Sequence, residues 1–179
     1  DSCFAVEDES QAGRPYIGVS SMGRTAKTSL SRVASSSFHH AQNIYKSSQP
    51  DSYQKKHAET FTTLVSYFNS LKELGGASVC YLDDVNEFLT NISRNLSQDR
   101  YQIKELCELT SRCSQQEIQR YLENLHLSRD SENSIDACLS TNMISVGVDV
   151  SRLGLMLING QTKSKSEYIQ ASSRVGRKY

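Results

Sequence analysis

Two short stretches of the sequence gather side chains that could bind phosphate groups. The first runs from Thr141 to Asp149 and supplies hydroxyls, an amide, a glycine and a carboxylate directly after an apolar run. Hydroxyl and amide side chains hold phosphate and sugar without reading bases, and Gly147 lets the backbone turn or approach a ligand closely. Taken alone, this stretch is better explained by turns and a helix cap.

The second stretch runs from Tyr168 to Arg177 and contains two arginines, Arg174 and Arg177, three positions apart. On a helix this spacing puts both on one face or at its end, where like charges repel each other unless they share an anion. Planar, permanently charged guanidinium groups suit a transferring phosphoryl group, whose charge is spread over several oxygens. Taken alone, an Arg-x-x-Arg sequence is more simply a solvated basic tail, here together with Lys178.

The elements expected to position these stretches alternate between strand and helix. The expected strands are 61–68, 77–82, 101–109, 135–139 and 155–158, with a helix possible over 101–109. The expected helices are 25–45, 70–74, 84–95, one opened by the capping box at 114–117, and one from Ser166. Here Gly75 and Gly76 stop one helix, and Asp83 and Asp84 cap the next. This alternation predicts an α/β fold with a mainly parallel sheet, whose carboxyl-end loops form the binding crevice.

In order and spacing, the two stretches resemble motifs V and VI of superfamily 2 helicases, which lie in the second RecA-like domain of those proteins. Thr141, Gly147 and Asp149 match motif V. The motif VI positions are matched by Gln170, Arg174, Gly176 and Arg177. The segment 64–70 occupies the place of motif IV, so the resemblance covers roughly residues 60–177 and rests on order and spacing. The amino-acid sequences of 142–154 and 167–177 are similar to those of the large helicases of DISARM anti-phage systems.

The sequence also departs from the family pattern. Val146 stands where the family often has Arg before the motif V glycine, and Ala171 and Ser173 replace the usual Arg and Gly of motif VI. No Gly-x-x-x-x-Gly-Lys-Ser/Thr phosphate loop occurs in the 179 residues. The resemblance therefore implies a domain that completes an ATP site formed elsewhere.

What the resemblance implies can be stated residue by residue. The fold would be a RecA-like three-layer domain, and Arg174 and Arg177 would be arginine fingers that reach the γ-phosphate. The nucleotide would be bound by Gly147, Asp149, Gln170, Arg174 and Arg177. The backbone of a nucleic acid, DNA favoured over RNA, would be contacted by Thr141, Asn142 and Ser145. ATP and Mg²⁺ would be bound mainly by the first RecA-like domain of the same protein, and no metal site is expected in this chain.

Bulk properties restrict the function further. The formal net charge is zero, with 20 basic and 20 acidic residues, so any nucleic-acid binding must come from a local patch. The sequence has no apolar run of membrane-spanning length. Its first residues also lack the succession of basic, apolar and small residues that is typical of a signal peptide. Its five cysteines form no Cys-x-x-Cys pair and fit free thiols. We therefore expect a cytoplasmic protein without a membrane partner.

The expected domain organisation has two parts. Residues 1–59 would be a lead-in or interdomain connection with one helix, and residues 60–179 the second RecA-like domain. The start without Met and the abrupt end suggest a fragment of a larger protein, inactive as an ATPase by itself. An alternative is a non-catalytic RecA-like module that binds nucleic acid or protein, although a pure scaffold has no need to keep the arginine pair. A stand-alone Rossmann-type enzyme is disfavoured because no Gly-x-Gly-x-x-Gly follows a strand.

Overall fold

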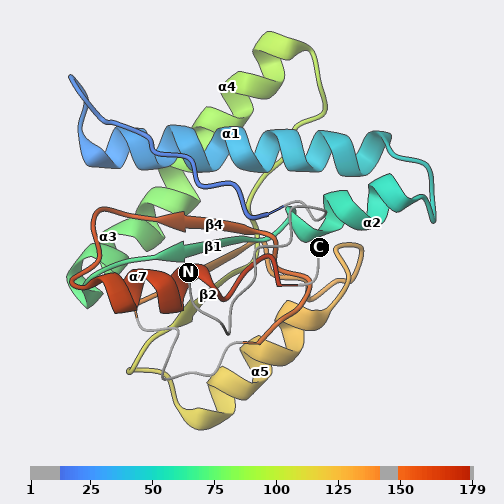
Figure 1. The fold of residues 1–179 in the computed structure, drawn as a ribbon. Helices are drawn as coiled ribbons and strands as arrows, with labels where there is room; N and C mark the ends of the chain where they lie inside the picture. Colours follow the sequence, from blue (N-terminus) through green and yellow to red (C-terminus); the bar gives the residue numbers. More distant parts are fainter. Residues whose placement is uncertain (1–12, 142–148, 178–179) are drawn as a thin grey trace.

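The computed structural model describes residues 13–141 and 149–177. Its centre is a sheet of four strands in the order β2-β3-β1-β4, and every pairing in it is parallel (Figure 1). In chain order the elements are α1 (Ala26–Ser47), α2 (Tyr53–Thr60), β1 (Leu64–Tyr67), α3 (Leu71–Cys80), the π-helical turn η1 (Tyr81–Val85), α4 (Asn86–Leu96), β2 (Leu106–Leu109), α5 (Gln115–His126), β3 (Ala137–Ser140), β4 (Leu155–Ile158) and α7 (Lys165–Ser172). The register aligns Leu64 of β1 with Ala137 of β3 and Leu155 of β4.

Hydroxyl side chains begin most of the helices. In five of them the residue before the first turn accepts a hydrogen bond from a backbone N–H of that turn; these residues are Thr25, Ser52, Ser70, Ser114 and Ser164. At the start of α5, the carboxylate of Glu117 also accepts the backbone N–H of Ser114, which completes the predicted capping box. These local signals explain why the helix starts at 26, 115 and 165 lie so close to the expected ones.

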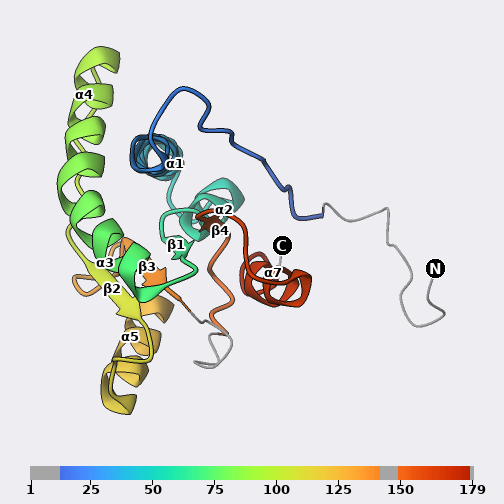
Figure 2. The same cartoon turned by 90° about the vertical axis from the view of Figure 1, so that its left-hand side faces the viewer.

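Each face of the sheet has its own hydrophobic core, because successive strand residues point to opposite sides. One core joins Leu64 of β1 to the inner faces of α1, α3 and α4, and includes the fully buried Phe38. The other joins Val65 of β1 to α5 and to Leu153 and Val175. Figure 2 shows α1, α3 and α4 on one side and α5 on the other. The predicted RecA-like α/β fold with a parallel sheet is therefore confirmed.

The predicted strand 77–82 is wrong. The chain is helical from Leu71 through η1 into α4, and Gly75 and Gly76 lie inside α3 without ending it. Leu74, Ala77 and Cys80 are buried at helical spacing, and this packing outweighs the cost of about 1 kcal/mol for each interior glycine. Asp84 is likewise no helix cap, since its carboxylate pairs with Lys27 of α1 at 2.7 Å.

Two further differences concern length and number. The apolar run 101–109 forms a strand only over its last four residues, Leu106–Leu109, and the run 61–68 only over Leu64–Tyr67. The lead-in contains a second helix, α2, and α1 contributes Leu30, Ala34 and Phe38 to the core. A boundary at residue 59 stays a prediction.

Two findings bear on the environment of the chain. Across 13–141 and 149–177, no helix has both the length and the apolar character to cross a membrane. Cys80, Cys107, Cys113 and Cys138 are free thiols. Burial and the neighbouring Asp84 raise the pKa of Cys80, while its contact with Ser31 opposes that rise.

Candidate functional site

The carboxyl ends of β1, β3 and β4 lie together. The first of the two stretches with phosphate-binding side chains, 141–149, begins at this edge of the sheet; it and the second stretch, 168–177, are called the chemical stretches below. Phe68 donates its backbone N–H to the carbonyl of Ser140 at 2.9 Å, and Asn159 donates to the carbonyl of Tyr67 at 2.9 Å. The amide of Asn69 donates to the carbonyl of Gln161 at 2.9 Å and ties the loops after β1 and β4 together. Half-buried Thr141 follows β3 directly at this edge of the sheet.

The first turn of α7 is attached to the same edge. The hydroxyl of Tyr67, at the end of β1, donates to the carboxylate of Glu167. Glu167 also accepts the backbone N–H of Lys163 at 3.1 Å, while its own N–H donates to the capping hydroxyl of Ser164. Burial of the phenol, and then the neighbouring carboxylate, raise the pKa of Tyr67 well above its ordinary value. The start of α7 is thus fixed by a buried anchor.

The other end of α7 leads into the arginine pair. After Ser172 the chain turns at Gly176, which has φ +64° and donates its N–H to the carbonyl of Leu153 at 2.8 Å. Val175, between the two arginines, is buried in the same core as Leu153. Arg174 is half-buried and Arg177 exposed. The arginine pair therefore follows the helix, on a turn held to the segment before β4.

Arg177 joins the two chemical stretches. Its Nη1 donates to Oδ1 of Asp149 at 2.6 Å, and its Nε donates to the carbonyl of Ser173 at 2.9 Å. The two bonds orient the guanidinium group. Because Asp149 is exposed, the ion pair contributes only ~0–1 kcal/mol to stability. An anion with more than one charged oxygen can therefore compete with Asp149 for Arg177.

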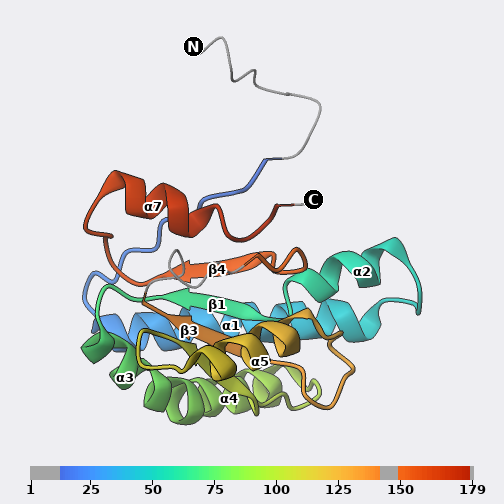
Figure 3. The same cartoon turned by 90° about the horizontal axis from the view of Figure 1, so that it is seen from below.

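The remaining predicted site residues are placed as follows. Thr141 lies beyond the carboxyl end of β3, whereas Leu153, which holds Gly176, precedes the amino end of β4. In Figure 3, α7 accordingly runs back along β4 toward the start of that strand. Gln170 is exposed on α7. Asn142, Ser145 and Gly147 lie outside the described residues.

A glycine-dependent contact supports the turn before β4. Gly154 donates its N–H to the carbonyl of Thr60 at 2.8 Å. A Cβ at this position would come within 2.7 Å of the Thr60 hydroxyl, so this close approach requires a residue without a side chain. The packing of α2 against the start of β4 therefore fixes the position of the Leu153 carbonyl, which accepts the N–H of Gly176.

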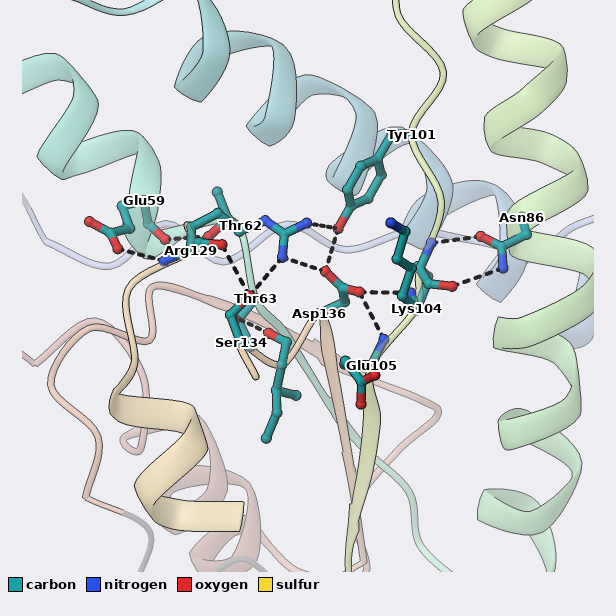
Figure 4. A network of polar contacts seen from close by, with 12 residues as sticks. Glu59, Thr62, Thr63, Asn86, Tyr101, Lys104, Glu105, Arg129, Ser134 and Asp136 are labelled. Atoms are coloured by element: carbon teal, nitrogen blue, oxygen red, sulfur yellow. Dashed lines mark hydrogen bonds and ion pairs between the residues drawn. The ribbon is translucent and has the colours of Figure 1, made fainter. Parts of the chain in front are cut away.

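The sequence reasoning missed a buried polar network at the amino ends of β2 and β3 (Figure 4). Asp136 is 2% exposed and pairs with Nη1 of Arg129 at 2.8 Å. It also accepts the hydroxyl of Tyr101 at 2.7 Å and the backbone N–H groups of Lys104 and Glu105 at 2.7 and 3.0 Å. A carboxylate inside a buried apolar run was the available signal, because such a charge is stable only when it is paired. With its acceptor positions filled, Asp136 is structural.

Two residues of the lead-in were missed as well. Arg14 donates its Nε to the carbonyl of Gly176 at 3.1 Å. The ring of Tyr16 lies 6.1 Å from that of Tyr168 on α7. More than 150 positions separate each pair, and the part of the lead-in before the helix at 25–45 has no periodic pattern, so the sequence carries no signal for these contacts.

Comparison with known proteins shows the family of the chain. Residues 57–179 match the helicase conserved C-terminal domain. The chain is 42% identical over 182 residues to the DISARM protein DrmA of Bacillus paralicheniformis, an alignment that covers 99% of this chain and 16% of that protein. The matches confirm the predicted resemblance to the C-terminal domain of superfamily 2 helicases and to a protein of a DISARM system. The chain belongs to the helicase conserved C-terminal domain family and is similar over nearly its whole length to one part of a much longer DISARM protein.

Proposed function

We propose that this chain is the second motor domain of an ATP-driven nucleic-acid helicase or translocase. In this function Arg174 and Arg177 complete an ATP site whose other half lies on a first RecA-like domain. The observation that carries the proposal is the ion pair between Arg177 and Asp149, since it brings the ends of both chemical stretches to one place on the surface. A freely solvated basic tail would not also bury Val175 or hold Gly176 on the carbonyl of Leu153.

The chemistry of the pair suits a γ-phosphate. Guanidinium groups present a planar fork to phosphate oxygens and keep their charge at any physiological pH. Arg177 is accessible and already oriented through Nε, so it would exchange one exposed carboxylate for an anion of higher charge. Charge on the phosphoryl oxygens grows as ATP is cleaved, which makes this contact stronger in the transition state than in the ground state.

We assign the phosphate contact to this chain and the metal to the first domain. In the part of the chain that the structure describes, no group of three or more His, Cys, Asp or Glu side chains could hold a metal ion. A phosphate loop is also missing from the sequence. Mg²⁺ and most of the nucleotide would therefore be held by the first domain, and Gly147, Asp149 and Gln170 would line the nucleotide from this side. When bound, Mg²⁺ would neutralise charge on the β- and γ-phosphates.

A single strand of nucleic acid would bind at the opposite end of the sheet, beyond the carboxyl end of β3. Thr141, with Asn142 and Ser145 after it, offers neutral hydrogen-bonding groups to a phosphate–sugar backbone, DNA by preference. Opening and closing of the cleft between the two domains would shift this contact relative to the nucleotide site. In a DISARM-related protein such a motor would serve antiviral defence.

The first test compares the full-length protein with this chain alone. We expect ATP hydrolysis that nucleic acid stimulates in the full-length protein, and none by residues 1–179, because the other half of the site is absent. Phosphate release is measured with and without single-stranded DNA and single-stranded RNA. The proposal would be contradicted by ATP hydrolysis from the purified chain alone, if that activity followed the concentration of the chain across the fractions of a final gel-filtration step.

The nucleic-acid contact makes a second prediction. Thr141→Ala in the full-length protein should weaken single-strand binding by about fivefold, the worth of one hydrogen bond to phosphate, and by the same factor for every base sequence. Because Thr141 is uncharged, the slope of log Kd against log salt should not change. Thr90→Ala on α4 is the control, since the hydroxyl of Thr90 donates to the carbonyl of Asn86 within its own helix. Fluorescence anisotropy with oligonucleotides of equal length measures the Kd of the parent protein and of both variants. A base-dependent loss would show that Thr141 reads sequence instead.

A further inference from the structure

The segment between residue 13 and α1 crosses the end of α7 (Figure 3), outside the region 57–179 that matches the helicase domain. Two of its side chains make the contact. Arg14 donates its Nε to the carbonyl of Gly176 at 3.1 Å, and Tyr16 places its hydroxyl 3.5 Å from that of Ser172. The ring of Tyr16 also lies over Tyr168, with an interplanar angle of 41°.

These contacts fix the backbone from which Arg177 projects. The N–H of Gly176 is held by the carbonyl of Leu153, and its C=O is held by Arg14. The first bond sets the peptide before Gly176, and the second sets the peptide after it, which carries Arg177. Glycine has no intrinsic preference between the conformations available here, so outside contacts must choose one.

Arg14 also fills the space beside Gly176. A Cβ on Gly176 would lie 3.4 Å from both Cγ and Nε of Arg14, so the arginine stem covers the bare face of the glycine. At φ +64° a side chain would be strained in any case. The missing side chain at residue 176 and the arginine at residue 14 therefore form one packing unit.

We infer that Arg14 is a positioning residue for Arg177: it holds the turn at Gly176 so that the guanidinium of residue 177 points at the γ-phosphate. The inference rests on the proposed function, because it gives Arg14 a role only through an arginine finger. Arg14 acts through a carbonyl, and not by lending its charge to the nucleotide. Tyr16 keeps the segment on α7 so that Arg14 stays in reach.

Small displacements of a group that contacts the transition state reduce rates strongly. The bond from Arg14 is exposed to water and is worth one ordinary hydrogen bond. We therefore expect Arg14→Ala to lower kcat by about tenfold, with KM for ATP changed by less than about twofold. Arg14→Lys, which can still donate to the carbonyl, should recover part of the loss.

The experiment uses the full-length protein with Arg24→Ala as the matched control. Arg24 is an exposed arginine in the same lead-in segment, and its removal should leave kcat unchanged. In an Arg177→Ala background, Arg14→Ala should cause no further loss, because the group that it positions is gone. Multiplied losses in the double variant would overturn the inference, since Arg14 would then act independently of Arg177.

A second readout is independent of turnover. Hydrogen exchange followed by mass spectrometry should show faster exchange in the peptide 165–177 for Arg14→Ala and not for Arg24→Ala. Unchanged exchange and unchanged kcat in Arg14→Ala would overturn the inference, and so would faster exchange with unchanged kcat. A silent Arg177→Ala would instead remove the proposed function, and the exchange data would still report whether Arg14 holds the turn.

Discussion

Arg177→Ala should reduce nucleic-acid-stimulated ATP hydrolysis by the full-length protein by ~10³-fold or more, equivalent to roughly 4 kcal/mol of transition-state stabilisation. The reason is that its guanidinium would meet charge that develops only as the γ-phosphate departs. KM for ATP should change much less than kcat, because the contact is weak in the ground state. Arg174→Ala should act in the same direction.

Three controls separate this role from a structural one. Arg177→Lys should rescue poorly, since an ammonium group lacks the bidentate fork. Asp149→Ala removes the ion pair but leaves the guanidinium in place, so it should lower kcat far less than Arg177→Ala. Because Asp149 would line the nucleotide, its loss should appear mainly in KM for ATP. Arg120→Ala on α5, an exposed arginine stacked on Tyr121, should be silent.

The outcome depends on folding as well as turnover. The Arg177–Asp149 pair is exposed and worth less than about 1 kcal/mol, so melting temperatures of all these variants should stay close to the parent value. Near-normal hydrolysis by a well-folded Arg177→Ala protein would remove the main support for the motor assignment. Equal losses in Asp149→Ala and Arg177→Ala would show instead that the ion pair itself matters.

What the sequence could predict was local. The hydroxyl caps before α1, α5 and α7 act within one helical turn, and alternating strands and helices determine a parallel sheet through short-range rules. The region 77–82 could not be assigned this way, because the strand-favouring Val79 and Tyr81 stand beside the helix-favouring Ala77 and Leu82. Packing of Leu74, Ala77 and Cys80 against the distant α1 decided it.

The same limit applies to the candidate site. The order of the two stretches predicted that they belong to one site, but not which residues meet. The partner of Asp149 depends on the turn at Gly176, and that turn depends on Leu153 and on Arg14, which lies 162 positions away. No periodicity in the sequence encodes such contacts, because they join residues that are far apart in the chain.

The amino ends of β2 and β3 are joined by another long-range feature, the buried carboxylate of Asp136. Asp136 accepts four donors: the Tyr101 hydroxyl, Nη1 of Arg129, and two backbone N–H groups at the approach to β2. It is joined to the start of β3, so it ties the amino ends of both strands together. Asp136 and Tyr101 are buried, as is every residue of β3, whereas Lys104 and Glu105 are exposed. Water can therefore replace the bonds to Tyr101 and Arg129 less readily than those to the two backbone N–H groups.

Asp136→Ala should therefore destabilise the domain by about 3–5 kcal/mol, since it leaves the largely buried guanidinium of Arg129 without its counter-charge and the buried hydroxyl of Tyr101 without its acceptor. The side chain of Arg129 is only 18% exposed, so water cannot fully solvate the uncompensated charge. Asp99→Ala is the matched control: Asp99 pairs with Lys46 at 3.5 Å and is 82% exposed, and its loss should cost less than about 1 kcal/mol.

Hydrogen exchange of the β2 and β3 peptides in the full-length protein measures this difference locally, where a global melt would mix several domains. The expected loss corresponds to exchange that is roughly 10²- to 10⁴-fold faster in Asp136→Ala, and nearly unchanged in Asp99→Ala. Arg129→Met should also be destabilising, and the double variant should lose less than the sum of the two, because each single change leaves the other partner buried without its counter-charge. Strictly additive losses would mean that Asp136 and Arg129 stabilise the strands separately, and that the ion pair is not what holds the amino ends of β2 and β3 together.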